Sequence, residues 1–293
     1  AERAGRTTRK FSAALKRVMD LNPVKHLGQY VTGISARRDF PAFESRSLFE
    51  RIEKQEGRGS PRVLYFAGCY TSYLKPHIGQ SAVAVLKSMG MTVVTPPQHC
   101  CGLPMLSKGM TKEAAAKIRQ NQNKWQALVD TVDHIVVTCS SCGFALMEDW
   151  QSLLENEFTA GVKGKIIHIS TLLNKYFDRL EFRDGDLEVS YHAPCHLKIQ
   201  PDPNSSIELL SRIPGIALRD LKSHCCGMIG SWGLTADHYD LSKQIGSEMI
   251  ARLNDSAASV GVTDCPTCRM QMEQFSHKEI KHPVEIVCDC LRG

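Results

Sequence analysis

Short apolar runs recur along the chain from residue 62 onward, and each ends close to a segment that contains cysteine. The runs at 63–66 and 187–191 precede Cys69 and Cys195, and runs of this length and composition are typical of buried strands. Second and third strands are predicted at 91–95 and 135–137, and again at 216–221 and 259–263. The same order of strands therefore occurs twice.

Helical segments separate the predicted strands. Residues 76–89 and 203–212 follow the first strands, and Pro76 and Pro203 suit a first helical turn. Longer polar helices are predicted over 111–130, with Thr111 as a candidate N-cap, and over 235–253. Alternating strands and helices with short connections predict an α/β fold with parallel sheets. Ligands collect at the carboxyl ends of such strands, so cysteines that follow the strands are candidates for common sites.

The twelve cysteines follow a pattern that repeats. Ten of them fall into two sets with the same order: a single cysteine, then Cys-Cys-Gly, then Cys-x-x-Cys. Equivalent positions differ by 125 or 126 residues throughout. The first set is Cys69, Cys100, Cys101, Cys139 and Cys142, and the second is Cys195, Cys225, Cys226, Cys265 and Cys268.

Residues around the cysteines repeat as well. His99 precedes the first Cys-Cys-Gly and His224 the second, and residues 137–142 match residues 263–268 in position and size. We infer a tandem duplication. It predicts a basic, partly helical leader at 1–61, a first module at 62–183 and a second module at 184–293. In both modules the ligands lie at the carboxyl ends of the strands.

Composition and charge bear on the cellular location of the protein. The content is 42% hydrophobic and 23% charged, and no apolar run reaches the ~20 residues of a membrane-spanning helix. No secretory pattern opens the sequence, so we expect a cytoplasmic location, peripheral on the inner face of the cell membrane if the leader binds there. No nucleic-acid partner is expected.

The leader combines basic and apolar residues. Residues 1–62 hold 14 Lys and Arg against 7 Asp and Glu, although the whole chain has a net charge of only +5. We expect a helix that packs on a partner subunit or on the first module, with a position on a membrane surface as the alternative. Its apolar residues are Phe11, Leu15, Val18, Met19 and Leu27.

Clustered cysteines in a reducing compartment bind metal or do redox chemistry more often than they form disulfides. We interpret the ten cysteines as ligands of two iron–sulfur clusters, which usually need four thiolates each. Gly102 and Gly227 allow tight turns beside the adjacent thiols. Structural zinc leaves one thiol spare in each set, a thioredoxin-like dithiol explains only Cys-x-x-Cys, and disulfides lack the oxidising compartment they need.

Other residues near the motifs have two interpretations. His99, His196 and His224 either tune a cluster through hydrogen bonds or serve in packing. Cys288 and Cys290 lie outside the repeat and are interpreted as buried or incidental thiols, with an additional ligand or redox role as the alternative.

The motifs resemble the cysteine-rich CCG domain. The doubled form resembles the B subunit of heterodisulfide reductase and the C-terminal part of the C subunit of anaerobic glycerol-3-phosphate dehydrogenase, and the second resemblance is closer. Glycolate and lactate oxidase iron–sulfur subunits share the same modules. The resemblance covers roughly residues 10–290. It rests on residues 67–70, 99–104, 141–146, 194–196 and 262–268.

The resemblance implies two clusters, of [4Fe–4S] type and of cubane or non-cubane geometry. It implies an electron-transfer subunit of a flavin-dependent dehydrogenase, which passes electrons from a flavoprotein subunit to membrane quinone. A catalytic subunit that reduces a disulfide at a non-cubane cluster is the first alternative. A zinc-stabilised interaction module is the second. Whether the chain is itself an enzyme stays open.

The chain departs from this family in one respect. Such dehydrogenase subunits begin with two ferredoxin-type motifs, whereas the first cysteine here is Cys69. We therefore expect a ferredoxin-type domain upstream or on another subunit.

Overall fold

The computed structural model describes residues 21–52 and 59–292, which form two parallel four-stranded sheets. The first sheet has the order β2-β1-β3-β4 and the second the order β6-β5-β7-β8. The strands are β1 (Arg62–Phe66), β2 (Thr92–Val94), β3 (His134–Val137), β4 (Ile166–His168), β5 (Leu187–Tyr191), β6 (Ile216–Asp220), β7 (Val260–Val262) and β8 (Glu279–Lys281). The predicted α/β duplication is confirmed.

Helices connect the strands in both halves, and the first half has additional helical segments between β3 and β4. In the first half they are α5 (Gly68–Tyr73), α6 (Pro76–Ser88), α7 (Leu103–Leu106), α8 (Thr111–Val129), α9 (Ser140–Phe144), the π-helix Ala145–Asp149, α10 (Trp150–Leu153), α11 (Glu157–Lys165), α12 (Ile169–Lys175) and the 3₁₀ turn Phe177–Arg179. In the second they are α13 (Cys195–Lys198), α14 (Ser205–Arg212), the 3₁₀ turn Trp232–Leu234, α15 (Tyr239–Asn254), α16 (Pro266–Phe275) and α17 (Pro283–Cys290).

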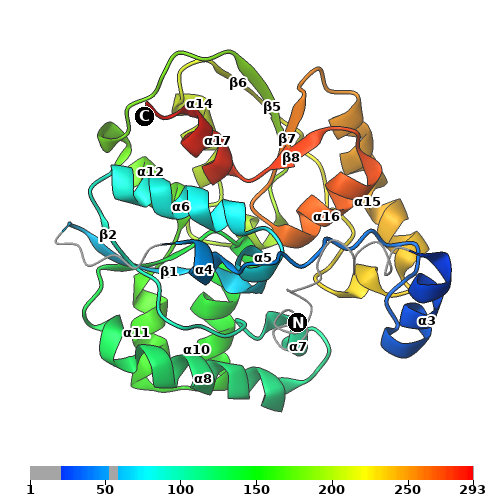
Figure 1. The fold of residues 1–293 in the computed structure, drawn as a ribbon, viewed down its shortest axis with the longest axis horizontal. Helices are drawn as coiled ribbons and strands as arrows, with labels where there is room; N and C mark the ends of the chain where they lie inside the picture. The colour runs from blue at the N-terminus through cyan, green and yellow to red at the C-terminus, as the bar shows by residue number, and fades with distance from the viewer. Residues whose placement is uncertain (1–20, 53–58, 293) are drawn as a thin grey trace.

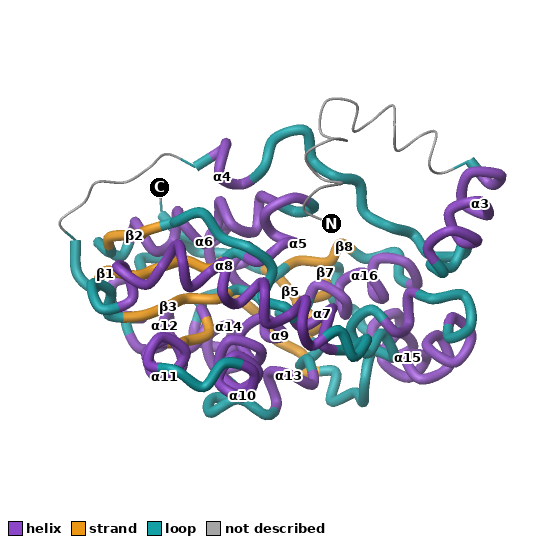
Figure 2. Tube along the Cα trace, turned by 90° about the horizontal axis from the view of Figure 1, so that it is seen from below, coloured by secondary structure: helices purple, strands orange, loops and turns teal. Residues whose placement is uncertain are grey.

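The two halves share one hydrophobic core. Val63 and Tyr65 of β1 face this core together with Val189 and Tyr191 of β5, and helices α6, α12, α14 and α17 fill the space between the sheets. The outer face of the first sheet is covered by α8 and α11, and that of the second by α15 and α16. Figure 2 shows the strands along the middle of the molecule with helices on either side.

Residues before β1 connect the two halves. Helices α3 (Asn22–Thr32) and α4 (Leu48–Arg51) lie in this part, and α3 occupies one end of the molecule (Figure 1). Ile34 forms an antiparallel bridge with Thr235 of the second half, whereas Leu48 is buried against α6 of the first. Of the predicted amphipathic helix, Phe11, Leu15, Val18 and Met19 lie outside the described residues, and Leu27 is exposed on α3.

Local details differ from the predictions. Thr111 is the first residue of α8 and does not cap it, since the N-cap is Met110. Helix α14 begins at Ser205, two residues after Pro203, and α15 begins at Tyr239 because Thr235 bonds back to Trp232 in the preceding turn. The fourth strand of each sheet was not predicted. The apolar run within β4 is only two residues long and that within β8 only one, too short to be recognised as a strand.

Candidate metal centre

The cysteines of each set follow the carboxyl ends of the strands. Cys69 follows β1 and Cys139 follows β3, which are neighbours in the sheet with parallel register Phe66↔Val137. The chain leaves these two strands toward opposite edges of the sheet, and such switch points are where open α/β sheets bind ligands. Cys195 and Cys265 take the same places after β5 and β7.

Each set of five thiols lies together. In the first set, hydrogen-bond contacts connect the sulfurs in the order Cys69, Cys100, Cys101, Cys142 and Cys139. In the second set the order is Cys195, Cys225, Cys226, Cys268 and Cys265, and the Sγ atoms of Cys226 and Cys268 are 3.1 Å apart. All ten predicted site residues are thus gathered at two places.

The thiols compete for their protons. Hydrogen bonds from Cys101 and Cys69 lower the pKa of Cys100 to about 3, and those from Cys195 and Cys226 lower the pKa of Cys225 to about 2. The same contacts raise the pKa of the neighbouring thiols well above the usual value, because a second thiolate beside the first is unfavourable. Only a cation among the sulfurs allows all five to ionise. The donor sets therefore fit a thiolate-bound metal cluster.

Backbone conformation shapes the Cys-Cys-Gly turns. Gly102 has φ +95° and Gly227 φ +84°, which L side chains rarely adopt. A Cβ at Gly227 would lie 2.1 Å from the carbonyl oxygen of Ser242 on α15. The predicted need for glycine is confirmed. Cys139 and Cys265 are the N-cap residues of α9 and α16, and a hydrogen bond from Cys268 lowers the pKa of Cys265 to about 5.

The two sets differ in exposure. Cys195 is exposed, whereas its counterpart Cys69 is half-buried. The remaining four positions match, with the first cysteine of each Cys-Cys pair half-buried and the other three buried. The second centre is therefore the more open one.

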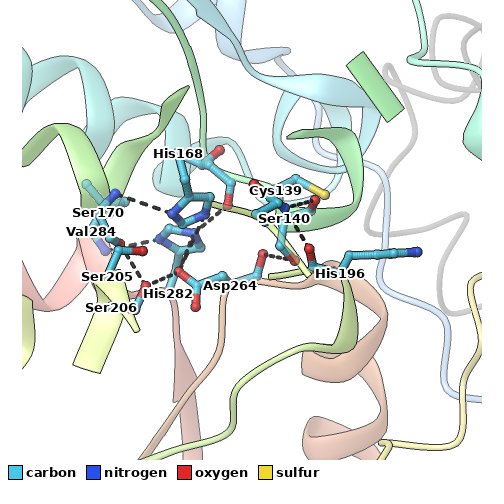
Figure 3. Close-up of polar contacts among 12 residues, drawn as sticks. Cys139, Ser140, His168, Ser170, His196, Ser205, Ser206, Asp264, His282 and Val284 are labelled. Carbon is cyan, nitrogen blue, oxygen red and sulfur yellow. Dashed lines mark hydrogen bonds and ion pairs between the residues drawn. The ribbon is translucent and has the colours of Figure 1, made fainter. Parts of the chain in front are cut away.

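The two Cys-x-x-Cys loops contact each other. The backbone N–H of Ser140 donates to the carbonyl oxygen of Asp264 at 3.2 Å, and Ser141 Oγ lies 3.6 Å from Cys265 Sγ. Ser141 Oγ also pairs with His196 Nδ1 at 2.9 Å. Residues beside the ligands of one centre thus touch those of the other, as Figure 3 shows for Ser140 and Asp264.

A buried polar network lies behind these loops (Figure 3). His282 of the second half donates from Nε2 to the carbonyl oxygen of Thr138 in the first, at 2.6 Å. His168 of the first half places Nε2 3.7 Å from Asp264 Oδ1 in the second, and Ser206 and Tyr191 donate to the same carboxylate at 2.8 and 2.5 Å. Thr138 and Asp264 each precede the first cysteine of a Cys-x-x-Cys motif. Each histidine therefore reaches the ligand loop of the opposite half.

The histidines of this network are neutral at neutral pH. Burial lowers the pKa of His168 to about 4 and also lowers that of His282. In both rings Nδ1 accepts a backbone N–H of the following helix, from Ser170 and Val284. The proton is therefore on Nε2, and it is His282 that uses this N–H for a hydrogen bond between the halves, to the carbonyl oxygen of Thr138.

The histidines singled out in the sequence have different positions. His196 pairs with Ser141 and stacks on Phe144, with ring centroids 5.1 Å apart. His224 points into solvent beside Glu248, and its side chain is 87% exposed. His99 is half-buried, and its backbone N–H donates to Asn121. Cys288 and Cys290 are half-buried on α17 and pack against the central core.

Sequence reasoning missed His168, His192, Asp264 and His282. Their side chains also contact residues 31 to 144 positions away in the sequence, such as Ser223 for His192 and Thr138 for His282, and no local pattern marks these contacts. For Asp264, the position immediately before Cys265 is a signal that could have been used.

The fold and the ten gathered thiols define a class: a duplicated α/β protein with one cysteine-rich centre at the carboxyl edge of each parallel sheet. The cysteine-rich CCG domain matches residues 63–147 and 189–273, and the chain belongs to this family. The module limits predicted from the sequence, 62–183 and 184–293, contain these two matches and remain a prediction.

Several curated proteins are similar to this chain. The C subunit of anaerobic glycerol-3-phosphate dehydrogenase from Escherichia coli K12 is 28% identical over 98% of this chain and 74% of its own length. The B subunit of fumarate reductase (CoM/CoB) from Methanothermobacter marburgensis is 28% identical over 78% of this chain and 45% of its own length. The D subunit of dihydromethanophenazine:CoB–CoM heterodisulfide reductase from Methanosarcina acetivorans is 25% identical over 72% of this chain and 53% of its own length. The chain is thus homologous to subunits of dehydrogenase and reductase complexes.

No helix among the described residues has both the length and the apolar character required to cross a membrane.

Proposed function

We propose that this chain is an iron–sulfur electron-transfer subunit of a flavin-dependent dehydrogenase complex of the glycerol-3-phosphate type. The observation that carries the proposal is the pair of five-thiol centres whose Cys-x-x-Cys loops contact each other through Ser141 and Cys265. Each set would bind one four-iron cluster through its five cysteines. Clusters held by touching loops can exchange electrons, and the chain would supply this path.

The partners follow from the same proposal. Electrons would enter from a flavoprotein subunit, directly or through a ferredoxin-type domain or subunit, and leave toward membrane quinone. The similarity to the C subunit of glycerol-3-phosphate dehydrogenase over 98% of the chain supports this assignment. Leu27, Tyr30 and Val31 are exposed on α3 and are suited to contact a partner subunit. We place the complex in the cytoplasm, at the inner face of the cell membrane.

The shape of the centres favours a cluster over structural zinc. A tetrahedral zinc site with Zn–S bonds of about 2.3 Å brings its sulfurs to about 3.8 Å from one another. Within residues 21–52 and 59–292, no three cysteines place their sulfurs within 4.8 Å of one another. The sulfurs instead form an extended row, which suits a larger metal core.

A second candidate function is the reduction of a disulfide at the second centre. The exposed Cys195 is the observation that favours it, since a substrate must reach a ligand sulfur. Reduction of a disulfide consumes two electrons and two protons and yields two thiols, and a partner subunit would supply the electrons. A thiol-dependent paramagnetic signal from the oxidised protein would support this role, and its absence would leave electron transfer alone.

The first test is the content of iron, zinc and acid-labile sulfide after anaerobic purification. We expect about eight irons with matching sulfide per chain, because two four-iron clusters would be bound. Cys142→Ser and Cys268→Ser should each remove about half of the iron. Cys288→Ser, a matched change on α17, should leave the content unchanged. Zinc without sulfide would contradict the proposal.

A further inference from the structure

The two halves differ at one position beside their centres. Residues 65–69 read Tyr-Phe-Ala-Gly-Cys and residues 191–195 read Tyr-His-Ala-Pro-Cys, with the same offset of 126 as the cysteines. Phe66 and His192 are therefore equivalent. Both are buried, at 0% and 1% exposure. A polar ring thus replaces an apolar one at the second centre.

His192 lies against the sulfurs of the second set. A ring nitrogen of His192 and the Sγ atoms of Cys226 and Cys268 lie within 4.8 Å of one another. Nδ1 pairs with Ser223 Oγ at 2.9 Å, while Nε2 is buried without a hydrogen-bond partner. A buried N–H without a partner is costly, so Nε2 is suited to an acceptor bound at the second centre, where the ring lies beside these two sulfurs.

The first centre offers no such donor at this place. The ring of Phe66 packs edge-on against Trp125, with centroids 5.4 Å apart, in an apolar cluster that includes Cys101, Cys139 and Cys142. The cluster of the first set would be surrounded here by hydrocarbon.

We propose that the ring N–H of His192 donates to a sulfur of the cluster in the second set, and so raises the reduction potential of that cluster above that of the first. This inference rests on the proposed function. A hydrogen bond to sulfur stabilises the reduced cluster more than the oxidised one, because reduction adds negative charge. Electrons would then collect at the second centre, where Cys195 is exposed.

Donation fits better than ligation to iron. Five thiolates already exceed the four ligands that an ordinary cluster needs, so a sixth protein ligand is not required. Ser223 Oγ–H can donate to Nδ1, which leaves the proton on Nε2.

The test is a redox titration of the full, anaerobically loaded chain followed by electron paramagnetic resonance. His192→Phe copies the residue of the first half and should shift one of the two midpoint potentials downward. A tenfold change in the reduction equilibrium corresponds to about 59 mV for one electron. His192→Asn retains an N–H donor and should restore part of the shift. The reciprocal Phe66→His should raise the other midpoint.

Controls separate the possible outcomes. His224→Phe changes the solvent-exposed histidine next to Cys225 and should leave both midpoints unchanged. Two clusters with unchanged midpoints in His192→Phe would overturn the role of His192 and leave the proposed function standing. Loss of half of the iron in His192→Phe, but not in His192→Asn, would also overturn it, since the ring would then be required for cluster binding itself. A wild-type chain that binds no cluster would overturn the proposed function.

Discussion

Thr138 and Asp264 occupy equivalent positions before the Cys-x-x-Cys motifs, and Tyr65 and Tyr191 contact them in the same way. The hydroxyl of Tyr65 pairs with Thr138 Oγ1 at 3.0 Å, and that of Tyr191 donates to Asp264 Oδ2 at 2.5 Å. Only the second half has a carboxylate here, and it is fully buried. Buried carboxylates are stable only when they are well hydrogen-bonded. Asp264 therefore depends on the hydrogen bonds that Tyr191 and Ser206 donate to it.

We predict that Asp264→Asn destabilises the protein by about 1.5–3 kcal/mol, because hydrogen bonds from Tyr191 and Ser206 to a charged acceptor are weakened. Chemical unfolding of the anaerobic protein measures the change. Asp255→Asn, at an exposed position after α15, is the matched control and should stay within about 0.5 kcal/mol of the wild type. Equal stability of the two variants would show that the network contributes nothing.

A buried arginine, Arg38, adds side-chain contacts between the segment before β1 and the second half. Arg38 donates to Gly233 O at 2.9 Å, to Gln271 Oε1 at 2.6 Å and to Ser242 Oγ at 2.7 Å. The neighbouring Arg37 instead forms an exposed ion pair with Asp240 at 2.7 Å. Arg38 thus makes buried contacts with the second half, and Arg37, the residue before it, makes an exposed contact with the same half.

We predict that Arg38→Met costs about 3–5 kcal/mol, because three buried acceptors lose their donor. Arg37→Met should cost much less than Arg38→Met, since exposed ion pairs contribute little to stability. Thermal unfolding of both variants measures the difference. A similar cost for both would mean that this segment does not depend on the buried contacts.

At the scale of the whole molecule, the shared core and the histidine network join the two halves. Helices α6, α12, α14 and α17 pack between the sheets, and His168 and His282 lie buried at the same interface. We therefore expect the halves to unfold together rather than as independent domains.

Acid should weaken this interface. The pKa of His168 is lowered from an ordinary 6.5 to about 4, so the unfolded chain binds more protons between these two values. The neutral state of His168 therefore costs no stability above pH 6.5. As the pH drops from 6.5 toward 4, the free energy of unfolding falls by up to about 1.4 kcal/mol per pH unit because of this histidine. Urea unfolding at pH 7 and pH 5 measures the loss. His168→Gln should make this loss of stability between pH 7 and pH 5 smaller, whereas His26→Gln, on the exposed α3, should leave it unchanged. An identical pH dependence in the two variants would contradict the role of His168.

Much of this architecture was predictable from the sequence. The apolar runs before Cys69 and Cys195 indicated β1 and β5, because a buried parallel strand needs a nearly continuous run. The three-residue strands β4 and β8 were not predicted, because their pairing with β3 and β7 defines them more than their own composition does. His168 is the last residue of β4 and His282 follows β8. Because these strands were not predicted, the polar network of the two histidines was not predicted either.

The sequence by itself determined the duplication, the two sets of five cysteines and their places after the strands. Spacing and strand ends are local properties, and parallel strands bring their carboxyl ends to one edge. Only the tertiary structure decided that the Cys-x-x-Cys loops touch, that Cys195 is exposed while Cys69 is half-buried, and that His168 meets Asp264. These properties depend on how the two sheets pack through α6, α12, α14 and α17. Contacts between side chains about 100 residues apart are set by that packing and by no local pattern.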